Sequence, residues 1–131
     1  TLSGTGFQQG ASVTFMNAPA VVSSVTPTSI VAIAPPRAPG PAVQGDVVVR
    51  NPDGQTARFT DAWIYAVRGD ANNNGAVTGA DTFYLNLAIF LGGTPPLTLC
   101  NGDANGSGAT TAADTFFLNL FVFLGGAAPP P

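Results

Sequence analysis

The feature that most constrains this chain is a direct repeat in its second half. Residues 69–93 align with residues 102–126 at a shift of 33, and 18 of the 25 aligned positions are identical. Each copy begins with a segment rich in Gly, Asn and Asp and continues into an apolar stretch that ends in Gly-Gly. Because paired glycines are typical helix stops, each copy predicts one loop followed by one helix, over residues 80–91 and 112–124.

Oxygen-bearing side chains recur in each copy at the spacing of a 12-residue calcium loop. In the first copy they stand at loop positions 1, 3, 5, 9 and 12, and Gly75 takes position 6, where such loops turn sharply. The backbone carbonyl at position 7 completes the set. The predicted ligands are Asp70, Asn72, Asn74, the Ala76 carbonyl, Thr78 and Asp81 in the first loop, and Asp103, Asn105, Ser107, the Ala109 carbonyl, Thr111 and Asp114 in the second.

A plainer interpretation uses some of the same residues. Thr78-x-x-Asp81 and Thr111-x-x-Asp114 are also helix capping boxes, which need no metal. The agreement of both copies at every ligand position favours two Ca²⁺ ions. Each loop has only two carboxylates, and position 12 is Asp where the common pattern has Glu. We therefore expect Kd values of roughly 10⁻⁵ to 10⁻³ M, which suit extracellular calcium. An ankyrin array has a similar period but needs two helices per repeat.

The order loop, helix, linker, loop, helix, with no helix entering either loop, resembles a dockerin, a duplicated calcium module with two F-hand loops. The likeness covers residues 69–126 and implies a small all-α module that docks onto a cohesin-like partner. The recognition positions of that family correspond to Gly79–Ala80 and Ala112–Ala113 in this sequence. Asn86 and Asn119 stand where basic residues are often found.

The composition excludes several other functions. Of the 131 residues only 8% are charged, and these are four Arg and seven Asp, with no Lys, Glu or His. No catalytic site is expected from so few catalytic group types. Four scattered Arg and a net charge of -3 give no basic surface for nucleic acid. No apolar run approaches the roughly 20 residues that span a membrane. The single Cys100 is either a buried apolar residue or an intermolecular bridge.

The first half of the chain predicts an antiparallel β-sandwich. Short alternating runs are separated by turn-forming residues, and Asn51–Gly54 has the composition of a β-turn between two long strands. The expected strands are residues 12–15, 29–33, 46–50, 56–60 and 62–65, and residues 35–45 are expected to form a loop. We therefore divide the chain into a sandwich, residues 1–67, and a calcium module, residues 68–131.

The sandwich is similar to an IPT/TIG domain, which is immunoglobulin-like. The motifs that carry this resemblance are Gly4-Thr5-Gly6-Phe7, Val13-Thr14-Phe15, Pro27-Thr28-Ser29-Ile30, Asp46-Val47-Val48-Val49, Asn51-Pro52-Asp53-Gly54 and Trp63-Ile64-Tyr65. The resemblance implies one further strand ahead of residue 1. That strand would come from upstream sequence or from another polypeptide, by β-augmentation.

Both predicted helices are apolar around almost their whole circumference, apart from Asn86 and Asn119. A helix of this kind is expected to be buried on all sides. Two such helices cover one face each of the other, so we expect the remaining faces to meet the sandwich, a protein partner or another copy of the chain. A head-to-tail contact that does not close would give a filament.

We therefore predict a non-catalytic, extracellular or cell-surface structural protein. Two bound Ca²⁺ ions would order a protein-binding module, and other copies of the chain would be its partners in a polymer. The alternative is the C-terminal anchoring region of a secreted hydrolase that binds a cohesin-bearing scaffold. A third hypothesis, carbohydrate binding, requires exposed aromatic side chains on one strand face, where Trp63 and Tyr65 would lie together.

Overall fold

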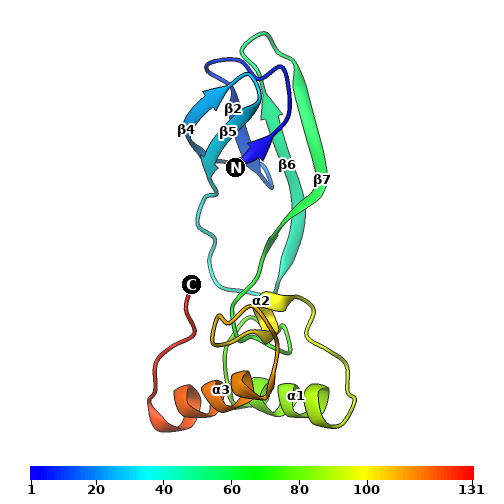
Figure 1. The fold of residues 1–131 in the computed structure, drawn as a ribbon, viewed down its shortest axis with the longest axis vertical. Helices are drawn as coiled ribbons and strands as arrows, with labels where there is room; N and C mark the ends of the chain where they lie inside the picture. Colours follow the sequence, from blue (N-terminus) through cyan, green and yellow to red (C-terminus); the bar gives the residue numbers. More distant parts are fainter. The chain divides into compact units, whose positions relative to one another are not determined.

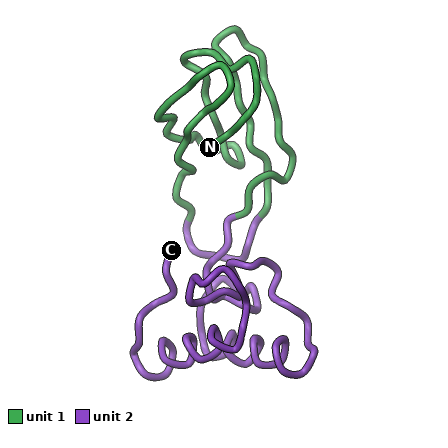
Figure 2. Tube along the Cα trace, viewed as in Figure 1, with its two compact units in different colours: residues 1–37, 44–64 green, residues 38–43, 65–131 purple.

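The computed structural model describes all residues from 1 to 131, and the chain forms two compact units (Figure 1). The first unit contains residues 1–37 and 44–64 (Figure 2). The second contains residues 38–43 and 65–131, so it takes in a short segment from the middle of the sandwich sequence as well as the whole repeat. Each unit has its own apolar core.

The first unit consists of two antiparallel sheets, as expected of an immunoglobulin-like sandwich. One sheet has the strand order β1-β5-β4, and the other has the order β3-β2-β6-β7. The strands are β1 Leu2–Ser3, β2 Ser12–Phe15, β3 Ala18–Pro19, β4 Val21–Thr26, β5 Ser29–Ile33, β6 Val43–Arg50 and β7 Thr56–Tyr65. The sequence predicted β2 and β5 at these bounds, whereas β1, β3 and β4 were not predicted.

Alternating residues of β2 and β6 supply most of the sandwich core. In their register, Val13 lies opposite Val49 and Phe15 lies opposite Val47. Successive strand residues point to opposite faces, so these four side chains share one face of the sheet. They form one buried cluster with Ile30, which is fully buried on the other sheet. The alternation of apolar and polar residues in these strands therefore predicts which side chains form the core.

The hairpin of β6 and β7 differs from its predicted form at both ends. β6 begins at Val43 rather than residue 46, so the preceding loop is shorter than expected. The two strands predicted over 56–60 and 62–65 form one strand, β7, interrupted only by the positive φ of 51° at Asp61. The connecting turn is confirmed, because the Gly54 N–H donates to the Asn51 carbonyl over 3.0 Å.

The sequence correctly places the two long helices of the second unit. α1 is Gly79–Phe90 and α3 is Ala112–Leu124, within one residue of the predicted bounds. A third helix, α2 over Leu99–Gly102, was not predicted, because four residues are too few to show a helical period. The start of α1 lies against the end of α3, since a Cβ added at Gly79 would come 2.8 Å from the Phe123 ring.

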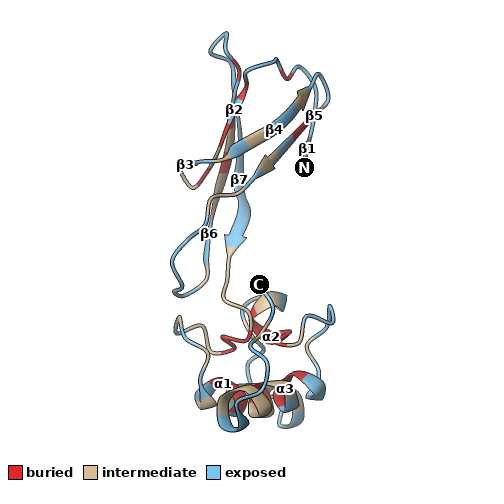
Figure 3. Cartoon of the chain, turned by 90° about the vertical axis from the view of Figure 1, so that its left-hand side faces the viewer, coloured by how far each residue is buried: buried red, intermediate tan, exposed pale blue.

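Equivalent residues of the two repeats form the core of the second unit. Ala71 and Ala104 are buried with Leu85 and Leu118, and each pair is separated by 33 residues. Within the single chain the helices are not buried all round, and coverage of their other faces by a protein partner or another copy stays a prediction. Each helix buries one narrow face, and large apolar residues on the other faces stay exposed (Figure 3). Neither long helix reaches the length and apolar content that a membrane-crossing helix needs.

The aromatic residue Trp63 on β7 is only partly covered. Its ring meets Phe15 edge-on, with centroids 4.8 Å apart, and the residue keeps 37% of its surface exposed. β7 is exposed along nearly its whole length, as its pale colour in Figure 3 shows. Trp63 therefore packs on a core residue, Phe15, but is itself an exposed aromatic residue outside the buried cluster.

Candidate metal centre

The first residue of each repeated loop is a buried aspartate that holds the loop backbone. Asp70 is fully buried; its Oδ1 accepts a hydrogen bond from the Asn74 N–H over 2.9 Å, and its Oδ2 accepts one from the Gly75 N–H over 2.8 Å. Asp103 makes the same two contacts with positions 5 and 6 of its own loop, over 2.8 and 2.9 Å. Both position-6 glycines, Gly75 and Gly108, have positive φ, 95° and 90°, which turns their N–H groups inward.

The last residue of each loop is an equally buried aspartate in the first turn of a helix. The Asp81 carboxylate accepts hydrogen bonds from the Asn72 N–H over 3.1 Å and from the Thr78 N–H over 2.8 Å. Asp114 makes the same contacts with positions 3 and 9 of the second loop, over 3.1 and 2.7 Å. Both capping boxes are therefore present, and the same carboxylates also reach across to the start of the loop. Capping by these carboxylates is compatible with a further role as metal ligands.

The remaining predicted side-chain ligands lie folded along their loops. Asn72 Oδ1 accepts a hydrogen bond from the Asn74 N–H over 3.0 Å, and Asn74 Oδ1 accepts one from the Ala76 N–H over 3.0 Å. In the second loop Asn105 Oδ1 accepts one from the Ser107 N–H over 2.9 Å. The Ser107 hydroxyl lies 3.3 Å from both Asp103 Oδ1 and the Ala109 carbonyl oxygen. Each loop thus gathers oxygen atoms within one compact turn.

The donor set fits Ca²⁺ and does not fit a transition metal. Every predicted ligand is an oxygen atom, two per loop are carboxylates, and nowhere do three or more His, Cys, Asp or Glu side chains gather. Asp70 and Asp81 are fully buried. Burying ionised groups costs free energy unless they are paired, and their hydrogen bonds leave lone pairs free on the carboxylates. A divalent cation bound between them would compensate that cost.

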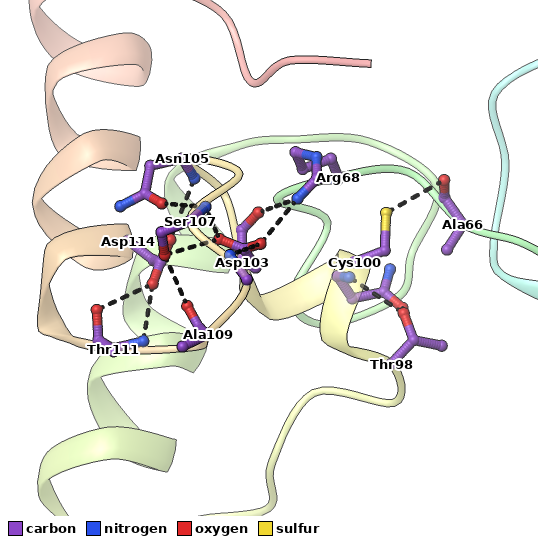
Figure 4. Close-up of polar contacts among 12 residues, drawn as sticks. Ala66, Arg68, Thr98, Cys100, Asp103, Asn105, Ser107, Ala109, Thr111 and Asp114 are labelled. Atoms are coloured by element: carbon purple, nitrogen blue, oxygen red, sulfur yellow. Dashed lines mark hydrogen bonds and ion pairs between the residues drawn. The ribbon is translucent and has the colours of Figure 1, made fainter.

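Arg68 distinguishes the second loop from the first. Its Nη1 donates to the Asp103 carbonyl over 2.8 Å and to Asp103 Oδ2 over 3.0 Å (Figure 4). Burial tends to raise the pKa of the Asp103 carboxyl, but the Gly108 and Ser107 N–H groups and the Arg68 charge outweigh it, so this pKa lies below its ordinary value. The equivalent of Arg68 in the repeat is Asn101, whose Nδ2 donates to the Asp70 carbonyl over 2.9 Å.

The first loop is held from outside the repeat as well. The Ala42 N–H donates to Asn73 Oδ1 over 2.5 Å, and a Cβ added at Gly75 would come within 3.0 Å of Gly40 and Pro41. Segment 38–43, which the sequence assigned to a plain connecting loop, is therefore part of the surroundings of this loop.

The single cysteine lies beside the repeat and not in either loop. Cys100 is partly buried in α2, and its Sγ lies 3.8 Å from the Ala66 carbonyl oxygen. The flanking Leu97 and Leu99 are exposed, so the apolar stretch around Cys100 does not form a core. The thiol is free within the chain.

Comparison with known proteins covers the first unit only. Residues 1–61 match the family of IPT/TIG domains, which are typically non-catalytic binding or structural domains. No curated protein and no solved structure matches the chain. The repeated loops lie outside the family match. The family match and the two antiparallel sheets together support an immunoglobulin-like sandwich in the first part of the chain, similar to IPT/TIG domains.

Proposed function

We propose that this chain is a non-catalytic structural protein in which two Ca²⁺ ions order a dockerin-like module for contact with other protein chains. The observation that carries the proposal is the fully buried pair Asp70 and Asp81 at the two ends of one loop, whose hydrogen bonds come from neutral donors. The second loop has buried aspartates at the same positions, Asp103 and Asp114, and there Asp103 also accepts a hydrogen bond from the Arg68 guanidinium.

Calcium would act on the helices through the position-12 aspartates. Asp81 belongs to the first turn of α1, and Asp114 belongs to the first turn of α3. An ion held by the first and last residues of a loop ties the start of its helix to the loop. Because Leu85 and Leu118 follow one turn later in the shared core, ordering both loops would also order the packing of the two helices.

The exposed helix faces support a protein-binding role. The same residues of both repeats are exposed, including Phe83 and Phe116, each 65% exposed, and Phe90 and Phe123. Exposed apolar patches of this kind mark protein interaction sites. IPT/TIG domains mediate protein–protein interactions and are common in extracellular or surface proteins. We propose other copies of this chain as the partners, in an extracellular or cell-surface polymer.

Calcium-dependent stability tests the metal part of this proposal. Thermal unfolding of the whole chain is measured with excess Ca²⁺ and with a chelator. At a concentration of 100 times Kd, each occupied site is expected to add about 2.7 kcal/mol to the free energy of unfolding. Replacing both position-1 residues, Asp70→Ala and Asp103→Ala, is expected to abolish this increment.

An aspartate outside the repeat provides the matched control. Asp53→Ala removes one negative charge from the turn of the sandwich. It is expected to leave the increase in the free energy of unfolding that Ca²⁺ produces unchanged. Identical unfolding of the parent chain with Ca²⁺ and with chelator would reject the calcium sites. Binding of a purified cohesin domain in Ca²⁺, with no self-association of the chain, would favour an anchoring role over a polymer.

A further inference from the structure

We propose that Arg68 makes the two calcium loops unequal, so that residues 70–81 bind Ca²⁺ about tenfold more tightly than residues 103–114. This inference rests on the proposed calcium function and assigns a specific role to a residue outside both loops. The two repeats are identical at 18 of 25 aligned positions, and they form an internal comparison in which the charge of the residue just ahead of each copy differs.

The geometry places a positive charge directly against a predicted calcium ligand of the second loop. Arg68 Nη1 contacts Asp103 Oδ2, the same oxygen that accepts the Gly108 N–H. In Figure 4, Asp103 lies between Arg68 on one side and Asn105, Ser107 and Asp114 on the other. The guanidinium therefore approaches Asp103 from the side opposite to these three predicted ligands. Its Nε makes no hydrogen bond, so Asp103 is the main group that offsets its charge.

The first loop has the same arrangement without the charge. Asn101 stands 33 residues after Arg68 and is fully buried. Its Nδ2 donates to the Asp70 carbonyl over 2.9 Å and to the Val67 carbonyl over 3.3 Å. Both side chains therefore cross from one repeat to support the first residue of the other loop. Asn101 does so as a neutral amide, and Arg68 does so as a cation.

The charge difference sets the direction of the affinity difference. An ion in the first loop meets two carboxylates, whereas an ion in the second loop meets two carboxylates and a nearby positive charge. The affinity of calcium loops follows the charge of their ligand set. A single unit charge that lies a few ångströms from a ligand, on the side away from the ion and in partly solvated surroundings, changes the dissociation constant of a divalent ion by on the order of tenfold. The first loop should thus fill first.

Residue-resolved titration of the whole chain with Ca²⁺ tests this inference. The N–H groups of Gly75 and Gly108 are the reporters in ¹⁵N–¹H spectra, because each donates to the position-1 carboxylate of its own loop. In the parent chain, half-saturation at Gly75 is expected at about one tenth of the Ca²⁺ concentration needed at Gly108.

Three variants isolate the charge of Arg68. Arg68→Gln keeps a side-chain donor for the Asp103 carbonyl. It is expected to raise the Ca²⁺ affinity of the second loop, reported by Gly108, about tenfold, so that the two loops bind equally. Arg68→Lys keeps the charge and is expected to keep the affinity difference between the loops. Arg50→Gln makes the same change in net charge in the sandwich and is expected to move neither reporter.

The outcomes separate the two proposals. If neither reporter responds to Ca²⁺, the calcium function fails and this inference fails with it. If both respond at one Ca²⁺ concentration in the parent chain, calcium binding stands and the role of Arg68 is refuted. The same conclusion follows if Arg68→Gln shifts the Gly108 titration no further than Arg50→Gln does. The parent titration needs no variant to fold, so equal affinities of the two loops in the parent chain would refute the inference directly.

Discussion

Asp46 shows how one carboxylate joins the two longest strands of the sandwich. Its Oδ1 accepts a hydrogen bond from the Asp61 N–H over 2.9 Å, and its Oδ2 is paired with Arg58, whose Nε lies at 2.5 Å. This contact also explains the positive φ of Asp61, since the backbone turns its N–H toward β6. The Asp61 N–H lowers the pKa of the Asp46 carboxyl most; burial opposes this shift and Arg58 adds to it, so the pKa lies below its ordinary value of 3.8.

A pH-dependent contribution to stability follows from Asp46. A carboxyl whose pKa is lower in the folded chain stabilises the fold above its unfolded pKa, and that stabilisation is lost as pH falls through the folded pKa. We therefore expect Asp46→Asn to lower the free energy of unfolding at neutral pH. The difference from the parent chain is expected to begin to shrink near pH 3.8 and to vanish as pH falls through the lower, folded pKa. Denaturant unfolding across this pH range measures it. An equal difference at neutral and acid pH would contradict the assignment.

Residues of the candidate metal centre fall into two groups by how far the sequence reveals them. The ligands of each loop lie within 12 consecutive residues of the chain, so their spacing alone predicts them, and the contacts of Asp70 and Asp81 follow that spacing. Arg68 and Asn101 act on residues 35 and 31 positions away, which only the packing of the two repeats brings together. Arg68 and Asn101 are 33 residues apart, which is the repeat shift. The sequence therefore shows that they are equivalent positions, but it does not show which residues they contact.

The two long helices end in a way that can be tested without disturbing any packing. Gly92 follows α1 and Gly125 caps α3, both with φ of 69°, and an added Cβ at either site would meet nothing within 4 Å. Alanine there is expected to cost about 1 kcal/mol, because side chains disfavour this left-handed conformation. Asparagine tolerates it better, so Gly92→Asn and Gly125→Asn are expected to cost less than the alanine variants.

Chemical denaturation in excess Ca²⁺, followed by the helical circular dichroism signal, measures these differences. The comparison of alanine with asparagine at one site removes any effect of filling space. Equal destabilisation by both residues would show that the glycines are needed for a reason other than their backbone conformation.

The strands show where local pattern fails to predict the elements. β2 and β5 alternate cleanly and were predicted at their bounds. β4 was not predicted, and its register against β5 shifts between Val22 and Ser24, a bulge that breaks the period-2 pattern. β7 was predicted as two strands divided at Asp61, which is the residue with positive φ. The break that the sequence predicts therefore corresponds to a real backbone irregularity at Asp61. The strand continues past Asp61 because Asp46 accepts a hydrogen bond from its N–H, and Asp46 lies in β6, outside the local sequence pattern.

Most of the acidic residues of the molecule lie in the repeat. Four of the seven Asp lie at the ends of the two loops, which leaves three Asp against four Arg in the rest of the chain. On the proposed function, two Ca²⁺ ions would change the net charge from -3 to +1. The remaining surface has few charges to oppose close approach of another chain. This favours association through apolar faces over repulsion between like-charged copies.

The equivalent faces of α1 and α3 provide the test of association. Phe83 and Phe116 are equally exposed, so Phe83→Gln with Phe116→Gln removes apolar surface from both helices at little cost to folding. If these faces bind other copies, the double variant is expected to remain monomeric in Ca²⁺ at concentrations where the parent chain assembles. Sedimentation velocity with Ca²⁺ and with chelator measures this. Val21→Gln, at a 67% exposed apolar site on β4, is the control and is expected to assemble like the parent. A parent chain that stays monomeric with Ca²⁺ would exclude self-assembly, and the exposed faces would then need a different protein as their partner.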